Sequence, residues 1–381
     1  MNSAIETLAP YAFTALSQRK SALQSQGMEL FDFGIGDPQD PTPAFIRQSL
    51  TDALQPESRY PTAAGLPELR QAIAGWFGRR FSVTLDPDVH VLPANGSKEA
   101  LFNLGTALLD DPRRGPQAVG VPELAYQVYA DSAWLHHAEV IHLPLGSDWL
   151  PDLSALTPEV LGRLRLLWLN YPNNPTGAVA PLSYYREALA LAERWGFYVA
   201  SDEAYSELWY DSPPTSLLQA GLGRAIAINT LSKRSNMTAY RSGVIAGDAQ
   251  VVAALRGVRP RMGVATPEFI QRAAVAAWED EAHVTAQRRR YAERRALLID
   301  VLERKGLTVD ASEATFYLWV RVPEWVEQRS SRQFAEWLLE RGIVVLPGEF
   351  LGVRGATHVR LALVPPLETC QRAAEILDRV L

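Results

Sequence analysis

The sequence has only one cysteine, Cys370, in 381 residues, so no disulfide can form within the chain. A single thiol is typical of a protein kept in a reducing compartment. The sequence also lacks the roughly 20 consecutive apolar residues that a membrane-spanning helix needs. The N-terminus carries an early acidic residue, Glu6, and no basic segment before an apolar run, so a signal peptide is not indicated. We therefore expect a soluble, cytoplasmic protein.

The sequence has no excess of basic charge. Lys and Arg total 37 against 43 Asp and Glu, which gives a formal net charge of −6. Proteins that bind nucleic acid usually carry a basic surface, so we expect no nucleic-acid partner. The six histidines include one adjacent pair, His136 and His137, which would point in different directions on a helix. No cluster of cysteines or carboxylates accompanies them, and we expect no metal site.

The chain does contain a regular alternation of short apolar runs and helical patterns. Hydrophobic residues make up 47% and charged residues 21%, which is ordinary for a globular protein with a large core. The apolar runs, which we interpret as buried parallel strands, are His90–Leu92, Ala118–Val121, Leu166–Leu169, Tyr198–Ala200, Ala225–Ile228 and Gly243–Ala246. Helical patterns such as Lys98–Leu109 and Tyr184–Trp195 lie between them. This order predicts an α/β fold with a mostly parallel, doubly wound sheet that binds ligands at the carboxyl ends of its strands.

The pattern changes after about residue 285. A long charged helix, Ala286–Lys305, is followed by strand-like segments at Thr315–Val322, Ile343–Leu346 and His358–Val364. We expect a smaller α+β domain here, with an N-terminal helix at about Ala12–Gln26 packed on it. The predicted organisation is an N-terminal segment (1–36), a large domain (37–285) and a small C-terminal domain (286–381).

Lys233 is the most informative residue of the chain. It stands with Thr230 and Ser232 just after an apolar strand, and Arg241 follows it. Asp202 ends an earlier strand, and the same strand-end position is taken by Asn95 and Asn170. A lysine can hold the aldehyde of pyridoxal 5'-phosphate (PLP) as a Schiff base, and a carboxylate can pair with the pyridinium nitrogen. Hydroxyl and guanidinium groups can hold the phosphate, so the sequence predicts a PLP enzyme.

Several short motifs extend this pattern along the chain. They are Gly36-Asp37-Pro38, Tyr60, Asn95-Gly96-Ser97-Lys98, Asn174-Pro175-Thr176-Gly177, Ser201-Asp202-Glu203-Ala204-Tyr205, Ser232-Lys233, Arg241 and Arg360. Each motif is weak alone, but their order and spacing resemble the class I/II aminotransferases of PLP fold type I. The resemblance covers nearly the whole chain and implies transamination by a PLP-binding large domain with a smaller α+β domain.

The resemblance assigns the chemistry to three residues. Lys233 would form the Schiff base with PLP and move the proton between the substrate Cα and the cofactor C4'. Asp202 would keep the pyridine nitrogen protonated, and a nearby cation would keep this carboxylate ionised despite burial. Tyr205, together with Asn174, would donate to the phenolic oxygen of the cofactor.

The resemblance also implies a phosphate site at the start of the helix that follows residue 95. Free N–H groups and the helix dipole would face the anion there, and side chains would add hydroxyl groups and a charge-assisted pair. The implied residues are Gly96, Ser97, Lys98, Thr230, Ser232 and Arg241. Thr230 departs from the serine that the family often has, while keeping the hydroxyl.

Two aromatic residues have implied roles with alternatives. Tyr60 resembles the tyrosine that reaches the phosphate from the partner subunit, which would make the active unit a homodimer with shared sites. Packing at a loop edge is the other interpretation of Tyr60. Tyr126 resembles the ring that stacks on the pyridine face, and Tyr129 is its rival.

Arg360 resembles the arginine that binds the substrate α-carboxylate through two parallel hydrogen bonds, a geometry that lysine cannot supply. Gly36 would let its backbone approach the same carboxylate, with Asn174 also at the substrate. These three residues form the implied substrate site for an amino acid and a 2-oxoacid.

Longer strings narrow the resemblance to the succinyldiaminopimelate transaminase group. They are Leu92–Leu101, Ser232–Asn236, Arg241–Asp248, Trp278–Val284 and Arg360–Leu367. They exceed what PLP chemistry requires, although most lie at cofactor or packing positions. The implied donor is N-succinyl-LL-diaminopimelate and the implied acceptor is 2-oxoglutarate, in a step of lysine biosynthesis.

Other functions stay open at this point. A related transaminase could act on aspartate, LL-diaminopimelate, aromatic amino acids or alanine. A PLP-dependent carbon–sulfur β-lyase would use the same cofactor residues and release pyruvate and ammonia without an oxoacid acceptor. A transcription regulator with an aminotransferase-like domain would need an added DNA-binding domain, for which we expect no room.

Overall fold

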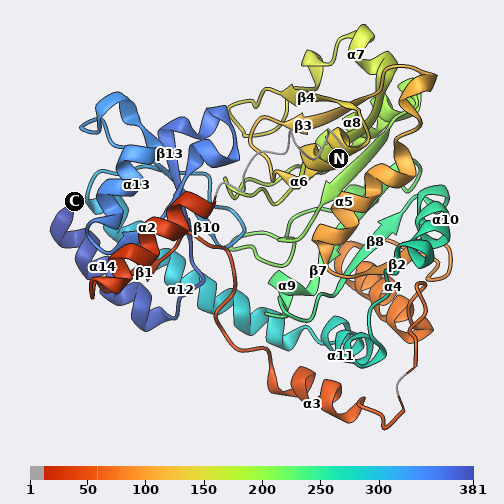
Figure 1. The fold of residues 1–381 in the computed structure, drawn as a ribbon, viewed down its shortest axis with the longest axis horizontal. Helices are drawn as coiled ribbons and strands as arrows, with labels where there is room; N and C mark the ends of the chain where they lie inside the picture. Colours follow the sequence, from red (N-terminus) through yellow and green to blue (C-terminus); the bar gives the residue numbers. More distant parts are fainter. Residues whose placement is uncertain (1–12, 58) are drawn as a thin grey trace.

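The computed structural model describes residues 13–57 and 59–381. Its larger part is built on a seven-stranded sheet with the order β2-β8-β7-β6-β5-β3-β4 (Figure 1). The strands are β2 (Val91–Ala94), β3 (Ala118–Pro122), β4 (Glu139–Leu143), β5 (Leu164–Asn170), β6 (Tyr198–Asp202), β7 (Ala225–Thr230) and β8 (Gly243–Gly247). Every predicted strand is present, which confirms the predicted α/β fold with a mostly parallel sheet.

β8 runs against its neighbours, where we predicted a parallel strand. It pairs antiparallel with β7 on one side and with β2 on the other, whereas the other neighbours in this sheet pair in parallel. Between β7 and β8 the chain forms only the one-turn helix α9 (Leu231–Arg234) and turns. No long helix carries the chain back across the sheet, as a parallel connection requires, so the prediction of a parallel strand at Gly243–Ala246 was wrong.

The edge strand β4 was not predicted. Only Leu143 of its residues is buried, and the others are exposed or half-buried. β4 pairs with β3 at the edge of the sheet. It therefore lacks the apolar run by which the other strands are recognised.

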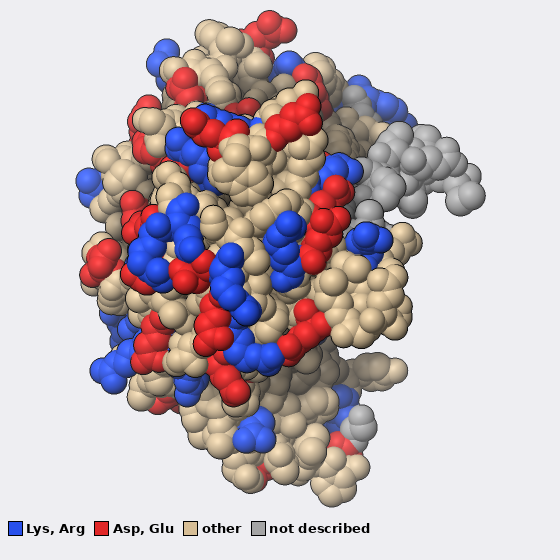
Figure 2. Space-filling view, turned by 90° about the vertical axis from the view of Figure 1, so that its left-hand side faces the viewer, with Lys and Arg blue, Asp and Glu red and all other residues tan. Residues whose placement is uncertain are grey.

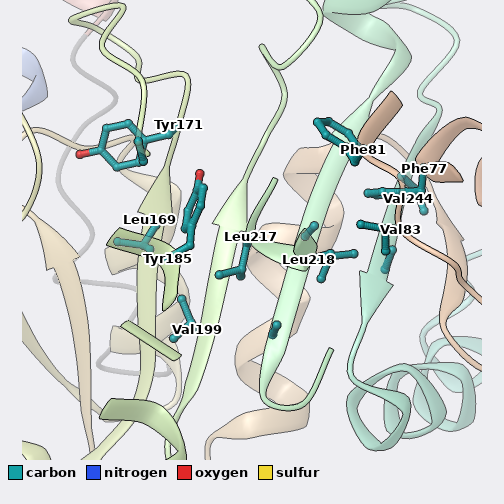
Figure 3. Packing of buried hydrophobic residues seen from close by; sticks show 14 of the residues in the cluster. Phe77, Phe81, Val83, Leu169, Tyr171, Tyr185, Val199, Leu217, Leu218 and Val244 are labelled. Carbon is teal, nitrogen blue, oxygen red and sulfur yellow. The ribbon is translucent and has the colours of Figure 1, made fainter. Parts of the chain in front are cut away.

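Helices cover both faces of this sheet. α4 (Pro67–Phe81), α8 (Leu182–Trp195) and α11 (Glu268–Glu279) pack on one face, and α5 (Ser97–Leu108), α6 (Val128–Leu135) and α10 (Ala249–Val258) pack on the other. Successive side chains of β5 alternate between the two cores: Leu167 and Leu169 join the first, and Leu166 and Trp168 join the second. Figure 3 shows part of the first core, where side chains of α4 and α8 pack with those of the strands. α3 (Ala44–Asp52) also packs on this core.

The smaller part of the molecule contains an antiparallel sheet with the order β12-β13-β10-β9. Its elements are β9 (Val309–Asp310), β10 (Tyr317–Arg321), β12 (Leu346–Pro347), β13 (His358–Ala362), α12 (Ala282–Arg304), α13 (Ser331–Leu339) and α14 (Leu367–Val380). A separate parallel pair consists of β1 (Phe31–Asp32) and β11 (Ile343–Val344). The segment predicted as one strand, Ile343–Leu346, therefore forms two, because its two ends pair with different partners.

The N-terminal helix α2 (Phe13–Ser25) lies beside this smaller part, at the left of Figure 1. Leu23 packs with Leu339 of α13 and Val344 of β11. Ala12, the first residue of the predicted helix, lies outside the described residues. The boundaries at residues 36 and 285 stay a prediction, and α12 continues without a break through residue 285.

Charges of both signs are interspersed on the face of the molecule that Figure 2 shows. Within the smaller part, Arg304 of α12 pairs with Asp378 of α14 at 2.9 Å, an exposed contact that adds little stability. Among the described residues, no helix combines the length and the apolar character needed to cross a membrane.

Candidate active site

A cavity of about 290 Å³ lies at the carboxyl ends of β5, β6 and β7, where the predicted fold places ligands. All the residues predicted for the site line it except Gly96 and Tyr60. They are Gly36, Ser97, Lys98, Tyr126, Asn174, Asp202, Tyr205, Thr230, Ser232, Lys233, Arg241 and Arg360. The fold thus brings together side chains from both parts of the molecule.

Lys233 lies in α9, and its Nζ donates a 2.6 Å hydrogen bond to the carbonyl of Gly36. Burial lowers the pKa of this amine to about 8. Asp37 raises the pKa, whereas the charges of Arg360 and Arg241 lower it further. A fraction of the amine is therefore neutral near neutral pH, as a group that attacks an aldehyde and accepts a proton must be.

Asp202 ends β6 and is buried. Its Oδ2 accepts a 2.8 Å hydrogen bond from the hydroxyl of Tyr129, and its Oδ1 accepts one of 3.2 Å from the N–H of Ala204. Burial raises the pKa of the carboxyl to about 6, although these two bonds and the charge of Lys233 lower it. Lys233 is thus the cation expected near Asp202, but its effect is smaller than that of burial.

Tyr129, the rival of Tyr126 for the stacking role, makes contacts of its own in the structure. It is fully buried, its ring stacks on Trp168 with the centroids 4.8 Å apart, and its hydroxyl is bonded to Asp202. Tyr126 is half-buried in the cavity wall, with the Nζ of Lys98 5.7 Å from its ring centre. The stacking role therefore stays a prediction for Tyr126, while Tyr129 orients Asp202.

Arg360 lies in β13 and is buried. Its Nη1 donates to Oδ1 of Asn174 at 2.8 Å and its Nη2 donates to the carbonyl of Gly34 at 3.0 Å. The guanidinium carbon lies 4.2 Å from the ring centre of Tyr317, a cation–π contact. The Nε is buried without a hydrogen-bond partner. A buried guanidinium in the wall of a cavity is suited to bind a carboxylate.

Tyr317 of β10 also lines the cavity and was not predicted. Its hydroxyl lies 3.0 Å from that of Tyr205, and a Cβ at Gly36 would overlap it. Gly36 therefore makes room for Tyr317. Burial raises the pKa of Tyr205 well above its ordinary value, with Tyr317 acting in the same direction, so Tyr205 stays a hydrogen-bond donor. The only signal in the sequence was that Tyr317 belongs to a predicted strand, which does not distinguish a site residue from a core residue.

Another part of the cavity wall is suited to an anion. Gly96 is the N-cap of α5 with a φ of +79°, and no side chain caps the helix there. A Cβ at Gly96 would overlap the guanidinium of Arg241, which donates to the carbonyls of Thr238 at 2.9 Å and Asn95 at 3.4 Å. The glycine is required by its backbone angle and by the arginine beside it. An uncapped helix N-terminus next to an arginine is a phosphate-binding arrangement.

Thr230 has a structural role in addition to its predicted one. Its Oγ1 accepts a 3.1 Å hydrogen bond from the N–H of Ser232, which caps α9, and lies 3.0 Å from the carbonyl of Ser242 as a donor. The hydroxyl therefore holds the turn that carries Lys233. A contact from Thr230 to a phosphate would compete with these bonds and stays a prediction.

Tyr60 does not line the cavity of its own chain. Its side chain is fully exposed, beside the exposed apolar side chains of Leu54 and Phe269. The contribution of Tyr60 to the phosphate site of a partner stays a prediction.

The residues present in this cavity fit PLP. The buried carboxyl of Asp202 suits a pyridinium nitrogen, the amine of Lys233 suits an aldehyde, and the N-terminus of α5 with Arg241 suits a phosphate. The guanidinium of Arg360 in the cavity wall suits the α-carboxylate of a substrate. Within residues 13–57 and 59–381, no group of three or more His, Cys, Asp or Glu is arranged to hold a metal ion.

Comparisons with known proteins agree with this arrangement. The family model described as "Aminotransferase class I and II" matches residues 28–377. An LL-diaminopimelate aminotransferase from Dehalococcoides mccartyi is 39% identical over 381 residues, which cover 98% of this chain and 96% of that protein. The crystal structure of an aminotransferase from Neisseria meningitidis has a TM-score of 0.92 and 36% identity, and covers 100% of both chains. A probable N-succinyldiaminopimelate aminotransferase from Thermus thermophilus has a TM-score of 0.89 and 33% identity, and covers 97% of this chain and 100% of that one.

Proposed function

Since the chain belongs to the class I and II aminotransferases, which use pyridoxal phosphate, we propose that it transfers the α-amino group of LL-diaminopimelate to 2-oxoglutarate. The observation that supports this donor is the 39% identity to an LL-diaminopimelate aminotransferase over nearly the full length of both chains. This specificity was an alternative in the sequence analysis, where we expected N-succinyl-LL-diaminopimelate. The succinylated donor is the second candidate, because a probable N-succinyldiaminopimelate aminotransferase is 33% identical.

Bound pyridoxal phosphate would carry the amino group between the two substrates and accept the electron pair released at the substrate Cα. Lys233 would move the proton at that carbon, since a pKa of about 8 lets its amine alternate between the neutral and charged forms near neutral pH. Asp202 would hold the proton of the ring nitrogen. The bonds from Tyr129 and Ala204 fix the orientation of this carboxyl, because they engage both of its oxygens.

Arg360 would bind the α-carboxylate of either substrate. Its burial keeps water from competing for the guanidinium, and the ring of Tyr317 lies against it. Asn174 accepts from Arg360 through its Oδ1, so its amide N–H groups are the ones that would donate to an acceptor in the cavity. Tyr205, which stays protonated, would be the second donor.

We predict that Arg360→Lys raises KM for the amino acid and for the oxoacid alike, because both present the same carboxylate. Lysine lacks the two-pronged geometry and would leave the acceptors on Asn174 and Gly34 unpaired. A loss on the order of 2–5 kcal/mol is expected for a desolvated, charged pair of this kind. Steady-state kinetics with each substrate varied measure it. Arg321→Lys, on an exposed arginine of β10 paired with Asp310, is the control, and unchanged KM values for Arg360→Lys would place the carboxylate site elsewhere.

The donor can be identified by half-reactions, in which the absorbance of the bound cofactor is followed after each amino acid is added. We expect LL-diaminopimelate to give the highest kcat/KM, about tenfold or more above N-succinyl-LL-diaminopimelate, aspartate, alanine and aromatic amino acids. A preference for the succinylated compound would favour the second candidate instead. Release of pyruvate and ammonia without an oxoacid acceptor would identify a carbon–sulfur β-lyase.

We also propose that the active unit is a homodimer with shared sites. Tyr60, Leu54 and Phe269 expose apolar surface along a groove of about 620 Å³. Exposed apolar side chains gathered in this way are typical of an interface. In such a dimer, Tyr60 of one protomer would reach the phosphate site of its partner.

This arrangement predicts complementation between two impaired variants. In a mixed dimer of Tyr60→Phe and Lys233→Ala subunits, one site would hold both lesions and the other neither. Activity per mixed dimer should approach half that of the wild type. Loss of one hydroxyl contact typically costs only about 0.5–1.5 kcal/mol, so the comparison is made at limiting PLP, where the Tyr60→Phe parent is impaired.

The control pairs Lys233→Ala with Tyr198→Phe, a change at the start of β6 that does not line the cavity. Those mixed dimers should show only the average of their parents. If the mixed dimers of Tyr60→Phe and Lys233→Ala subunits also show only the average of their own two parents, Tyr60 does not contribute to the site of the partner.

A further inference from the structure

Two of the sequence segments that resemble the succinyldiaminopimelate transaminase group contact each other in the structure. They are Ser232–Asn236 and Trp278–Val284. The first overlaps α9, and the second spans the junction of α11 and α12, which lies close to α9 in Figure 1. Hydrogen bonds between side chains join them at Ser235 and His283. These contacts have no assigned role in transamination.

The contact is a chain of three side chains. Ser235 Oγ lies 2.8 Å from Nε2 of His283, and Nδ1 of His283 lies 2.6 Å from Oδ1 of Asp280. The same order of groups activates the nucleophile of serine hydrolases. Here Ser235 is 0% exposed, so no acyl group can reach it and a hydrolytic role is excluded. The three hydrogen-bonded side chains must therefore act on the structure of the protein itself.

The protonation state of His283 determines which atoms donate and which accept in these hydrogen bonds. Burial lowers the pKa of His283, and Arg234 acts in the same direction, while Asp280 and Glu207 oppose it. A neutral ring can donate from Nδ1 to the carboxylate of Asp280 and accept at Nε2 from the hydroxyl of Ser235. Both ring nitrogens are then satisfied, and Ser235 is held by a directional bond.

The turn that carries Lys233 needs such support. α9 is one turn long, and a helix of this length has no stability of its own. The carbonyl of Lys233 accepts a 2.6 Å bond from Nε2 of Gln287 in α12. Arg234 donates to the carbonyls of Ala277 and Asp280, the latter at 3.1 Å. With Ser235, three consecutive residues of the turn are therefore tied to α11 and α12.

The other half of α12 is tied to the substrate side of the cavity. Arg294 donates to the carbonyls of Leu363 and Val364 at 3.3 and 3.4 Å, just after β13, the strand that carries Arg360. It also pairs at 2.7 Å with Asp40, which follows the Gly36 segment. One continuous helix thus connects the lysine turn with the elements that hold the carboxylate site.

We propose that Ser235, His283 and Asp280 are positioning residues that hold the Lys233 turn on α12 and thereby set the place of the lysine amine relative to Arg360. None of the three lines the cavity, so they act through Lys233. The inference rests on the role proposed for Lys233 and is independent of which amino acid is the donor.

The test compares Ser235→Ala, His283→Leu and His283→Gln with the wild-type holoenzyme. Steady-state turnover with the best amino donor gives kcat and KM. Visible circular dichroism reports how rigidly the cofactor is held, and thermal unfolding of the apoprotein reports stability. His136→Gln is the matched control, because His136 also bonds a serine carbonyl and a hydroxyl, those of Ser132 and Thr106, but between α5 and α6. Because Ser235→Ala removes a single oxygen, this variant should fold. It therefore tests the proposal even if His283→Leu does not fold.

We expect Ser235→Ala and His283→Leu to lower kcat about tenfold or more, since a displacement of the order of 1 Å at the reacting group is costly. KM should change by less than about twofold, because Arg360 is untouched. The visible circular dichroism should weaken in both variants, and His283→Gln, whose amide can still accept from Ser235, should keep more of kcat than His283→Leu. The control should match the wild type in all three measurements.

The proposal is overturned if Ser235→Ala and His283→Leu keep kcat and the visible circular dichroism near wild-type values, even when the apoprotein melts at a lower temperature. That result would assign the three residues to stability alone. A failure of the role of Lys233 is recognised separately, because the cofactor would then be attached to another residue in the wild-type enzyme.

Discussion

Replacement of Lys233 by alanine is expected to abolish covalent attachment of pyridoxal phosphate and to lower kcat by roughly 10⁴-fold or more. Two functions are lost together, the amine that binds the aldehyde and the group that carries the proton. The fold should survive, because the change removes a partly buried cation whose Nζ is bonded to one backbone carbonyl, that of Gly36. Loss of activity would therefore report chemistry and not unfolding.

Borohydride reduction followed by peptide mapping measures the attachment directly. The chain has only four lysines, Lys20, Lys98, Lys233 and Lys305, so the labelled peptide is easily assigned. Lys98 is the competing residue, because it also lines the cavity. The label should stay on Lys233 in Lys98→Ala and vanish in Lys233→Ala, and a label on Lys98 would refute the assignment.

The second large effect is expected for Asp202→Asn. An asparagine cannot compensate the charge of a protonated ring nitrogen, so the electron-accepting capacity of the cofactor should fall and kcat should drop roughly 10²–10³-fold. The side chain would keep its size and one acceptor for the hydroxyl of Tyr129. Single-turnover kinetics with saturating amino acid measure the loss at the chemical step.

The same variant should be at least as stable as the wild type without cofactor, in a pH-dependent way. Burial raises the pKa of Asp202 from 3.8 to about 6, so the ionised carboxylate destabilises the folded apoprotein. The destabilisation is absent below the ordinary pKa and complete above the raised one. The stability gained by Asp202→Asn should therefore grow between about pH 4 and pH 6 and level off above, reaching on the order of 1–3 kcal/mol.

Denaturant unfolding of the wild-type and Asp202→Asn apoproteins across this pH range tests the sign of the change in stability. Glu203→Gln is the matched control, since Glu203 is an adjacent buried carboxyl whose pKa burial raises to about 7, yet it does not line the cavity. It should gain stability in the same sense while retaining cofactor and turnover. A stability difference for Asp202→Asn that is constant with pH would contradict the raised pKa.

The strands that carry site residues could be predicted because burial on both faces makes each of them an apolar run. Asp202 and Thr230 follow such runs, and the carboxyl ends of parallel strands meet at one edge of a sheet. The direction of β8 could not be predicted in this way, because an apolar run looks the same in a parallel and an antiparallel strand. β4 gave no signal, because its exposed edge position leaves only Leu143 buried.

The contacts that tune the site were beyond prediction for a different reason. Tyr317 meets Gly36 and Tyr205 only because β10 of the smaller part packs over the cavity. The sequence also did not show which of the two tyrosines, Tyr126 or Tyr129, packs beside Trp168 and Asp202, and the structure shows that it is Tyr129. Such pairings depend on the path of the chain between distant segments.

The sequence by itself determined the family and the apolar strands of the large sheet. Local strand and turn preferences place Asp202 at the end of β6 and Lys233 in the turn that follows β7. Only the tertiary structure decided how these groups are tuned: the pKa of about 8 for Lys233, the pKa of about 6 for Asp202 and the contacts of Arg360 with Tyr317 and Asn174. Tuning depends on burial and on neighbours that lie far away in the chain, and these exist only once the chain has folded.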